Sequence, residues 1–201
     1  LLNKIFKDKK ESQIKIGMLS RIEPNKGQSD LIAAFKLMPI EFKKKIKIYL
    51  IGAGKKKYID QIKLEIKNNG LEEFFKITGY VDCSSLIILS RLDLLISLTR
   101  DFEGFGITCA QALLMKKPIL ATNVGAISEF LDNNNAKLIK PNNIREIKVA
   151  ILDFINNQDK WERKALKGNR FIKEKFDISK TSKKYYSYLT SFLNKNCKSE
   201  L

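Results

Sequence analysis

The chain has 201 residues, of which 44% are hydrophobic and 30% charged, and its formal net charge at pH 7 is +16. This composition is typical of a globular protein with one large core, and no apolar run approaches the roughly 20 residues of a membrane span. Histidine is absent, and the three cysteines have no paired spacing, which argues against a disulfide framework and a zinc site. We therefore expect a chain from a reducing compartment, cytoplasmic or at the inner face of a membrane.

The excess of lysine is compatible with binding to nucleic acid, to an anionic membrane surface or to a phosphorylated ligand. The lysines are spread along the whole chain, and no compact basic tract contains interleaved aromatic residues. We therefore predict that the chain does not bind nucleic acid, and we keep a peripheral membrane contact as an alternative.

Apolar runs alternate with segments of helical periodicity along most of the chain. Strands are predicted at residues 14–19, 46–51, 74–78, 93–98, 118–122 and 136–139, and helices at 26–38, 84–90, 107–115, 159–174 and 178–196, with others after Gly54 and Asn143. This alternation is typical of an α/β fold with a doubly wound parallel sheet, whose buried strands are apolar on both faces. We predict one such domain at 14–175, a linker or arm at 1–13 and a C-terminal helix at 176–201.

Charged residues and glycines follow the predicted strands at their carboxyl ends. Arg21 and Lys26 follow the first strand, Gly54 follows the second, and the run from Glu103 to Gly106 follows the fourth. The carboxyl ends of parallel strands meet at one edge of a sheet, where open α/β sheets bind ligands. We therefore expect the ligand site at this edge.

The chemistry of these residues indicates which ligand suits the edge. Arg21 and Lys26 are two cations in one loop, and Gly104 and Gly106 leave backbone N–H groups free at a helix N-terminus, so the edge favours a phosphate or diphosphate. Glu103 repels phosphate, and its carboxylate can instead accept hydrogen bonds from hydroxyl groups. Together these groups indicate a nucleotide sugar.

Structural roles for the same residues remain open at this point. Glu103 can cap the helix that follows it, Arg21 and Lys26 can be solvated loop charges, and Phe105 can be a core anchor. Gln111 lies one turn into an apolar helix and needs a partner, for which a ligand hydroxyl and a backbone carbonyl are the candidates.

Four segments resemble one family in order and spacing. They are "LSRIEPNKGQSDLIAAF", "IYLIGAG", "ITGYV" and "DFEGFGITCAQALLMKKPILATNVGAISEFL". Between residues 14 and 140 they resemble the donor-binding, C-terminal half of retaining GT-B glycosyltransferases of the family 4 type. The resemblance implies a Rossmann-like nucleotide-sugar-binding domain, and a missing N-terminal half that carries the acceptor site.

The resemblance also implies an activity. It is the metal-independent, retaining transfer of a hexosyl group from a nucleotide-diphosphate sugar to a glycan or lipid-linked acceptor, as in polysaccharide or lipopolysaccharide biosynthesis. No cofactor and no metal are implied. The chain by itself is expected to be inactive, because it lacks the acceptor domain.

The family's motifs then assign roles by position. Arg21, Lys26 and Glu103 are the implied catalytic residues, the cations acting on the diphosphate and the carboxylate on the donor sugar. Gln111 stands where the family has a second glutamate, which holds the ribose hydroxyls. The implied donor-binding residues are Gly54, Val81, Gly104, Phe105, Gly106, Ile107 and Gln111.

Two further classes of function stay as alternatives. One is a non-catalytic module that binds a nucleotide sugar, which glutamine at position 111 favours. The other is a basic protein of membrane surfaces or nucleic acids on the same scaffold. A nucleotide-sugar epimerase fits less well, because the spacing of Arg21, Lys26 and Glu103 matches the transferases.

Overall fold

The computed structural model describes residues 2–6 and 13–196. In these residues six parallel strands form one sheet with the order β3-β2-β1-β4-β5-β6. The strands are β1 (Ile14–Leu19), β2 (Ile46–Ile51), β3 (Phe75–Gly79), β4 (Leu94–Ser97), β5 (Ile119–Thr122) and β6 (Lys137–Ile139). The predicted parallel, doubly wound sheet is confirmed, and the direction of winding reverses between β1 and β4.

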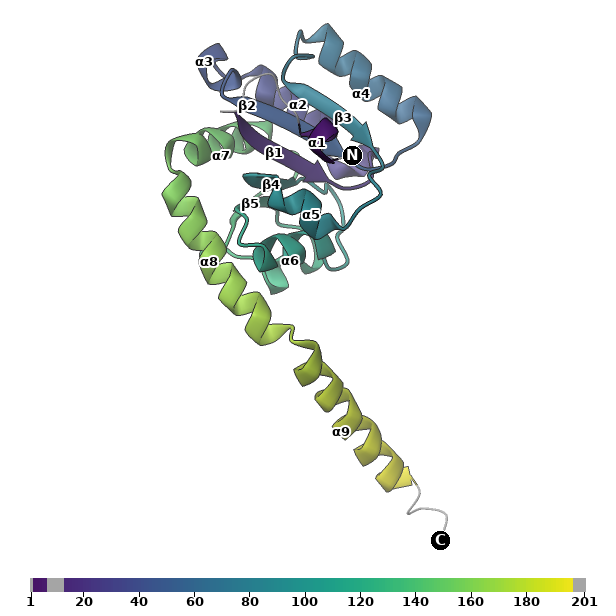
Figure 1. The fold of residues 1–201 in the computed structure, drawn as a ribbon. Helices are drawn as coiled ribbons and strands as arrows, with labels where there is room; N and C mark the ends of the chain where they lie inside the picture. The colour runs from purple at the N-terminus through teal and green to yellow at the C-terminus, as the bar shows by residue number, and fades with distance from the viewer. Residues whose placement is uncertain (1, 7–12, 197–201) are drawn as a thin grey trace.

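Helices cover both faces of the sheet (Figure 1). Alternate residues of each strand point to opposite faces, so Ile16 and Ile48 belong to one core and Tyr49 and Leu95 to the other. The first core is covered mainly by α2 (Gln28–Lys36), α4 (Lys56–Asn68) and α7 (Ile144–Asn156), and the second by α5 (Ser85–Ser90), α6 (Ile107–Leu114) and part of α8 (Gln158–Lys175). Burial on both faces explains why the strands are almost entirely apolar.

The first predicted helix begins later than the sequence pattern indicates. Pro24–Lys26 form a short 3₁₀ turn, η1, and α2 begins only at Gln28. Gly27 separates them with φ = +76°, and an added Cβ at this position would lie 2.3 Å from the carbonyl oxygen of Leu98. Glycine therefore lets the η1 loop approach the end of β4, and this contact fixes the position of Lys26.

The N-terminal segment differs from the predicted linker at 1–13. Leu2–Ile5 form a short helix, α1, and the buried ring of Phe6 packs against Tyr49 at a centroid distance of 4.8 Å. The apolar residues Leu2, Ile5 and Phe6 recur at helical spacing, which explains this packing. The charged run at 7–12 lies outside the described residues.

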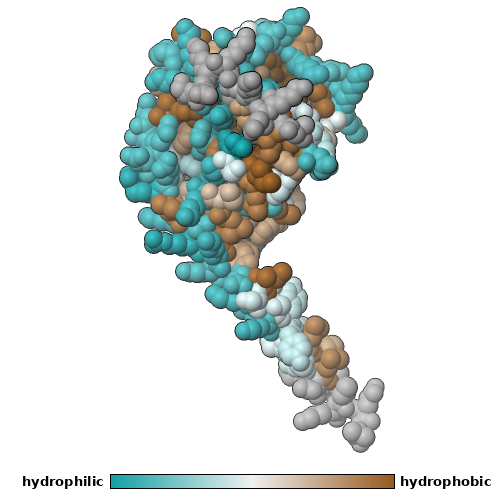
Figure 2. All heavy atoms as spheres, in the orientation of Figure 1, coloured by the Kyte–Doolittle hydropathy of each residue, from teal (hydrophilic) through white to brown (hydrophobic). Residues whose placement is uncertain are grey.

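The C-terminal helix α9 (Ile178–Asn196) extends away from the body of the domain (Figure 1). Its apolar side chains are exposed, as Figure 2 shows, and they include Tyr185, Leu189 and Phe192. Two shorter elements complete the described chain, α3 (Ile40–Lys43) and the 3₁₀ turn η2 (Gly125–Glu129). Among the described helices, none has the length and apolar character required to cross a bilayer.

Candidate functional site

A pocket of about 280 Å³ opens at the carboxyl edge of the sheet, between β1 and β4. Its walls are residues 19–21, 95–99 and 106–109 together with Lys26 and Glu103. The two strands are neighbours in the sheet but not consecutive in the chain, so the pocket lies where the winding reverses. Open α/β sheets bind their ligands at this point, and we call this cavity the donor pocket, after the nucleotide-sugar donor that the sequence predicts for this edge.

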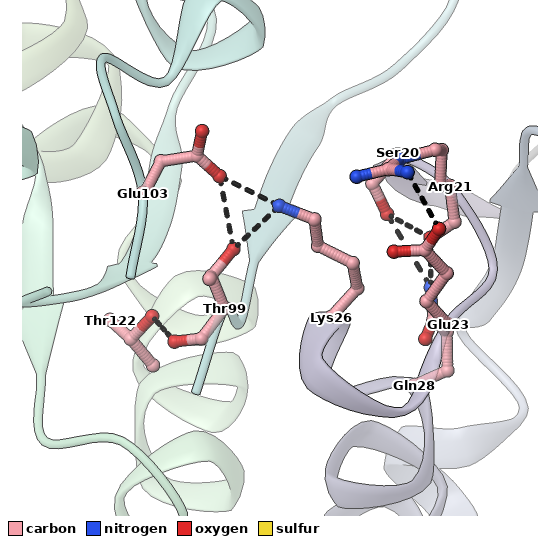
Figure 3. Close-up of polar contacts among 8 residues, drawn as sticks. All are labelled: Ser20, Arg21, Glu23, Lys26, Gln28, Thr99, Glu103 and Thr122. Atoms are coloured by element: carbon pink, nitrogen blue, oxygen red, sulfur yellow. Dashed lines mark hydrogen bonds and ion pairs between the residues drawn. The ribbon is translucent and has the colours of Figure 1, made fainter. Parts of the chain in front are cut away.

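Lys26 and Glu103 meet inside the donor pocket (Figure 3). Lys26 Nζ lies 2.9 Å from Glu103 Oε2, and the two side chains are 15% and 23% exposed. Thr99 Oγ1 lies 3.4 Å from Lys26 Nζ and 3.2 Å from Glu103 Oε2, and Thr122 Oγ1 donates a 2.6 Å hydrogen bond to the Thr99 carbonyl. The sequence prediction placed Lys26 and Glu103 at one edge of the sheet but missed Thr99, whose hydroxyl forms hydrogen bonds with both side chains.

Arg21 lines the same pocket as Lys26, and Figure 3 shows its side chain beside Glu23. Its side chain is 72% exposed, and its guanidinium forms a 2.9 Å ion pair with Glu23. The buried Gln28 donates a 2.9 Å hydrogen bond from Nε2 to the Arg21 carbonyl, so the backbone is fixed while the guanidinium faces solvent. The two predicted cations are thus brought to one pocket, although only Lys26 is partly buried there.

The first turn of α6 adds a polar wall without a side-chain cap. Gly106 is the N-cap residue with φ = +79°, and it provides no side-chain cap for the backbone N–H groups that follow. Residues 106–109 line the pocket, so these N–H groups and the positive end of the helix dipole are available to an anion. The predicted roles of Gly106 and Ile107 are compatible with this geometry.

The loop after β5 supports Glu103 from behind. The carbonyl oxygen of Glu103 accepts a 2.9 Å hydrogen bond from the backbone N–H of Ala126. Gly125 has φ = +55°, and a Cβ added there would lie 2.2 Å from the same carbonyl oxygen. Only glycine leaves room for this contact, which fixes the backbone of Glu103 relative to η2.

Cys109 closes the floor of the pocket. It is fully buried, and burial raises the pKa of its thiol to about 12, while a hydrogen bond with Ser97 acts in the opposite direction. At pH 7 the thiol is therefore protonated. The side chain therefore acts as a neutral, apolar part of the pocket.

We expect Cys109 to resist alkylation by iodoacetamide at neutral pH in the folded chain and to react after unfolding in urea. The half-buried Cys83 is the internal comparison and should be modified faster. Peptide mass spectrometry measures the modification at each position. Equal modification of both thiols in the folded chain would contradict the buried, protonated state of Cys109.

Several predicted donor-binding residues lie outside the donor pocket. Gly54 forms a parallel β-bridge with Ile22, and a Cβ there would lie 2.4 Å from the Ile22 carbonyl oxygen, so its absence of a side chain serves loop packing. Val81 is buried in the core that contains Tyr49. Gly104 is exposed beside the pocket. Donor binding by these three residues stays a prediction.

Phe105 and Gln111 have partners within the protein. The Phe105 ring packs against Phe130 and Phe176 at centroid distances of 5.2 and 5.3 Å, as the alternative of a core anchor predicts. Gln111 is half-buried rather than buried, and its Oε1 accepts a 2.8 Å hydrogen bond from Ser85 Oγ. Its partner in the structure is therefore neither of the two candidates that the sequence suggested. Ser85 and Gln111 lie 26 positions apart, so no local sequence pattern could identify them as partners.

The described residues contain no group of three or more Cys, Asp or Glu side chains with an arrangement that suits a metal ion. The positive charge at the edge comes from Arg21, Lys26 and the α6 N-terminus. Each cation is already paired with a carboxylate, so an incoming anion competes with Glu23 and Glu103 for them.

The fold and the site together define a Rossmann-like domain with an anion-compatible pocket at the reversal point of its sheet. The family model described as "Glycosyl transferases group 1" matches residues 3–171. The chain therefore belongs to the group 1 glycosyl transferases, and it corresponds to the C-terminal half of a GT-B glycosyltransferase, as its motifs predict.

Curated relatives agree with this assignment. The chain is 28% identical over 194 residues to the uncharacterized glycosyltransferase MJ1069 of Methanocaldococcus jannaschii. The matched segment covers 96% of the chain and 49% of the relative. It is 27% identical to the poly(ribitol-phosphate) alpha-N-acetylglucosaminyltransferase of Staphylococcus aureus, over 88% of the chain and 35% of that enzyme. The chain thus spans about half the length, or less, of these relatives.

Solved structures show the same fold. Anabaena Alr3699/HepE in complex with UDP and glucose superposes with a TM-score of 0.82 at 24% identity, over 90% of this chain and 49% of that one. The C-terminal domain of the group 1 glycosyl transferase LpcC from Francisella tularensis superposes with a TM-score of 0.73 at 21% identity, over 88% and 98% of the two chains.

Proposed function

We propose that this chain is the donor-binding domain of a retaining glycosyltransferase and that it binds a nucleotide-diphosphate sugar in the donor pocket. The observation that carries the proposal is the contact of Lys26 with Glu103 and Thr99 beside the uncapped N-terminus of α6. One small cavity then contains a cation and free N–H groups for phosphate, and a carboxylate and a hydroxyl for sugar hydroxyl groups.

Each group has a distinct role in the proposal. Lys26, Arg21 and the α6 N-terminus stabilise the negative charge that develops on the diphosphate leaving group. When the diphosphate enters, Lys26 exchanges Glu103 for a phosphate oxygen, and the freed carboxylate accepts hydrogen bonds from the donor sugar. The proposal assigns leaving-group stabilisation to these groups of the chain and invokes no metal ion.

The nucleotide is proposed to be UDP. Two solved structures with this fold, of Anabaena HepE and Staphylococcus aureus TarM, are complexes with UDP. In this chain Gln111, held by Ser85, is proposed to bind the ribose through its amide, which is a weaker partner than the charged carboxylate of the family.

Calorimetric titration with UDP, GDP, ADP and UDP-glucose tests the proposal directly. We expect saturable binding of the UDP series, and tighter binding of UDP-glucose than of UDP. In Glu103→Gln the amide keeps the shape of the side chain but loses its charge. The ratio of the affinity for UDP-glucose to that for UDP should therefore decrease about tenfold, while UDP itself still binds. Absence of saturable binding to all three nucleotide series would overturn the proposal.

Transfer itself is proposed to need a second half. The chain spans about half the length of its relatives, and we assign the glycan or lipid-linked acceptor to the remaining half, in an enzyme that acts in the cytoplasm or at the inner face of the membrane. We expect this chain to bind donor without transferring sugar. Release of UDP by this chain, dependent on an added acceptor, would contradict that requirement.

A further inference from the structure

An ion pair between Asp30 and Arg100 lies next to the donor pocket without lining it. Two nitrogens of the guanidinium face the carboxylate, with Nε at 2.9 Å from Oδ2 and Nη2 at 2.6 Å from Oδ1. The side chain of Asp30 is 10% exposed and that of Arg100 is 31% exposed. A two-point contact fixes the relative orientation of both side chains, which a single exposed ion pair does not do. The pair therefore joins two parts of the fold firmly.

The pair connects the two segments that carry the charged groups of the donor pocket. Asp30 lies in the first turn of α2, shortly after Lys26. Its partner Arg100 is 70 positions away and follows β4, shortly before Glu103. The backbone N–H of Arg100 also donates a 2.8 Å hydrogen bond to the Asn25 carbonyl. Arg100 thus holds the η1 loop by its backbone and α2 by its side chain.

The contact of Lys26 with Glu103 depends on how these two segments are held together, because Lys26 lies on η1 and Glu103 follows β4. We propose that Arg100 and Asp30 are positioning residues, which hold the η1 loop against the end of β4 and so keep Lys26 in contact with Glu103 and Thr99. Neither residue lines the donor pocket, so each acts through Lys26. This role deepens the proposed function and depends on it wherever UDP is the probe.

Acetylation of lysine amines by N-hydroxysuccinimidyl acetate, measured by peptide mass spectrometry, tests the role without a ligand. In Arg100→Gln, Lys26 should react about tenfold faster, because the loop opens more often after loss of a hydrogen bond to a charged group. The exposed Lys36 on α2 is the internal reference, and its rate should not change. The milder variant Asp30→Asn retains an oxygen acceptor and should act in the same direction. Arg100→Lys retains the charge without the two-point contact and should restore part of the protection.

Trp161→Phe is the control for a general loss of stability. It removes the 2.8 Å hydrogen bond from Trp161 Nε1 to the carboxylate of Asp153, and neither residue lines the donor pocket. We expect this variant to be less stable than the parent chain but to show the parent rate of acetylation at Lys26. Equal acceleration in Trp161→Phe and Arg100→Gln, or no acceleration in Arg100→Gln and Asp30→Asn, would overturn the positioning role.

Calorimetric titration with UDP provides the second readout. Arg100→Gln should weaken UDP binding about tenfold, whereas adding it to Lys26→Ala should change the affinity less than about twofold. Additive losses would show that Arg100 acts independently of Lys26, and would overturn the role. If the parent chain binds no UDP, the proposed function fails, and acetylation of Lys26 still decides the positioning role. If it binds UDP and Arg100→Gln has the same affinity, only the positioning role is overturned.

Discussion

Replacing Gly125 with alanine is expected to lower the free energy of unfolding by about 2–4 kcal/mol and to weaken UDP binding in the same variant. The left-handed backbone at φ = +55° costs any side chain about 1–2 kcal/mol, and relief of a close contact adds a similar amount. The new Cβ would lie 2.2 Å from the carbonyl oxygen of Glu103. Relief of this contact displaces Glu103 from Lys26, so stability and affinity fall together.

Gly70 provides the matched control. It has a similar backbone angle, φ = +62°, but an added Cβ there meets nothing within 4 Å. Gly70→Ala should therefore show only the backbone cost of about 1–2 kcal/mol and normal UDP affinity. Urea unfolding and calorimetric titration measure both quantities. Equal destabilisation of the two variants, with UDP affinity retained in each, would show that η2 does not position Glu103.

Lys26→Ala is expected to weaken UDP binding by about 1.5–3 kcal/mol, the range for hydrogen bonds to charged groups. The Lys26 side chain is only 15% exposed and its ammonium contacts Glu103 and Thr99, so a phosphate that reaches it is partly shielded from water. Lys36→Ala changes the net charge equally at an exposed position of α2 and should bind UDP normally. Calorimetry on both variants measures the difference.

A second titration in salt distinguishes the local contact from a general charge effect. If Lys26 binds phosphate directly, the affinity difference between Lys26→Ala and Lys36→Ala should persist at about 0.5 M salt, where exposed charges are screened. Unchanged UDP affinity in Lys26→Ala would exclude this residue from the donor site.

The strands were predictable from sequence because the sheet is covered on both faces. β1 and β2 are nearly continuous apolar runs, each interrupted by one lysine, and their predicted bounds at 14–19 and 46–51 match the structure. The predicted start of the first helix at Lys26 was wrong. Gly27 has a left-handed backbone because the loop packs closely against the Leu98 carbonyl, and this long-range contact leaves no local sequence pattern. Phe6 was missed for a related reason, since its partner Tyr49 lies on a different element.

The site was predictable as a set of loops but not as a set of contacts. Parallel strands bring Arg21, Lys26 and Glu103 to one edge, and the structure places all three on one pocket. Thr99 gave no signal, because a threonine after a strand is ordinary in any α/β protein. The approach of Gly125 to Glu103 likewise depends on how two loops pack, which local patterns do not specify.

The ion pair of Lys26 and Glu103 joins residues 77 positions apart and connects the loops of β1 and β4. Binding of a ligand that contacts both groups therefore depends on the folding of this whole part of the chain. The ligand binds only after the chain from β1 through β4 has reached its native arrangement, and it stabilises that state by mass action. A fragment that ends before Glu103 should therefore lack the thermal stabilisation that we expect UDP to give to the whole domain.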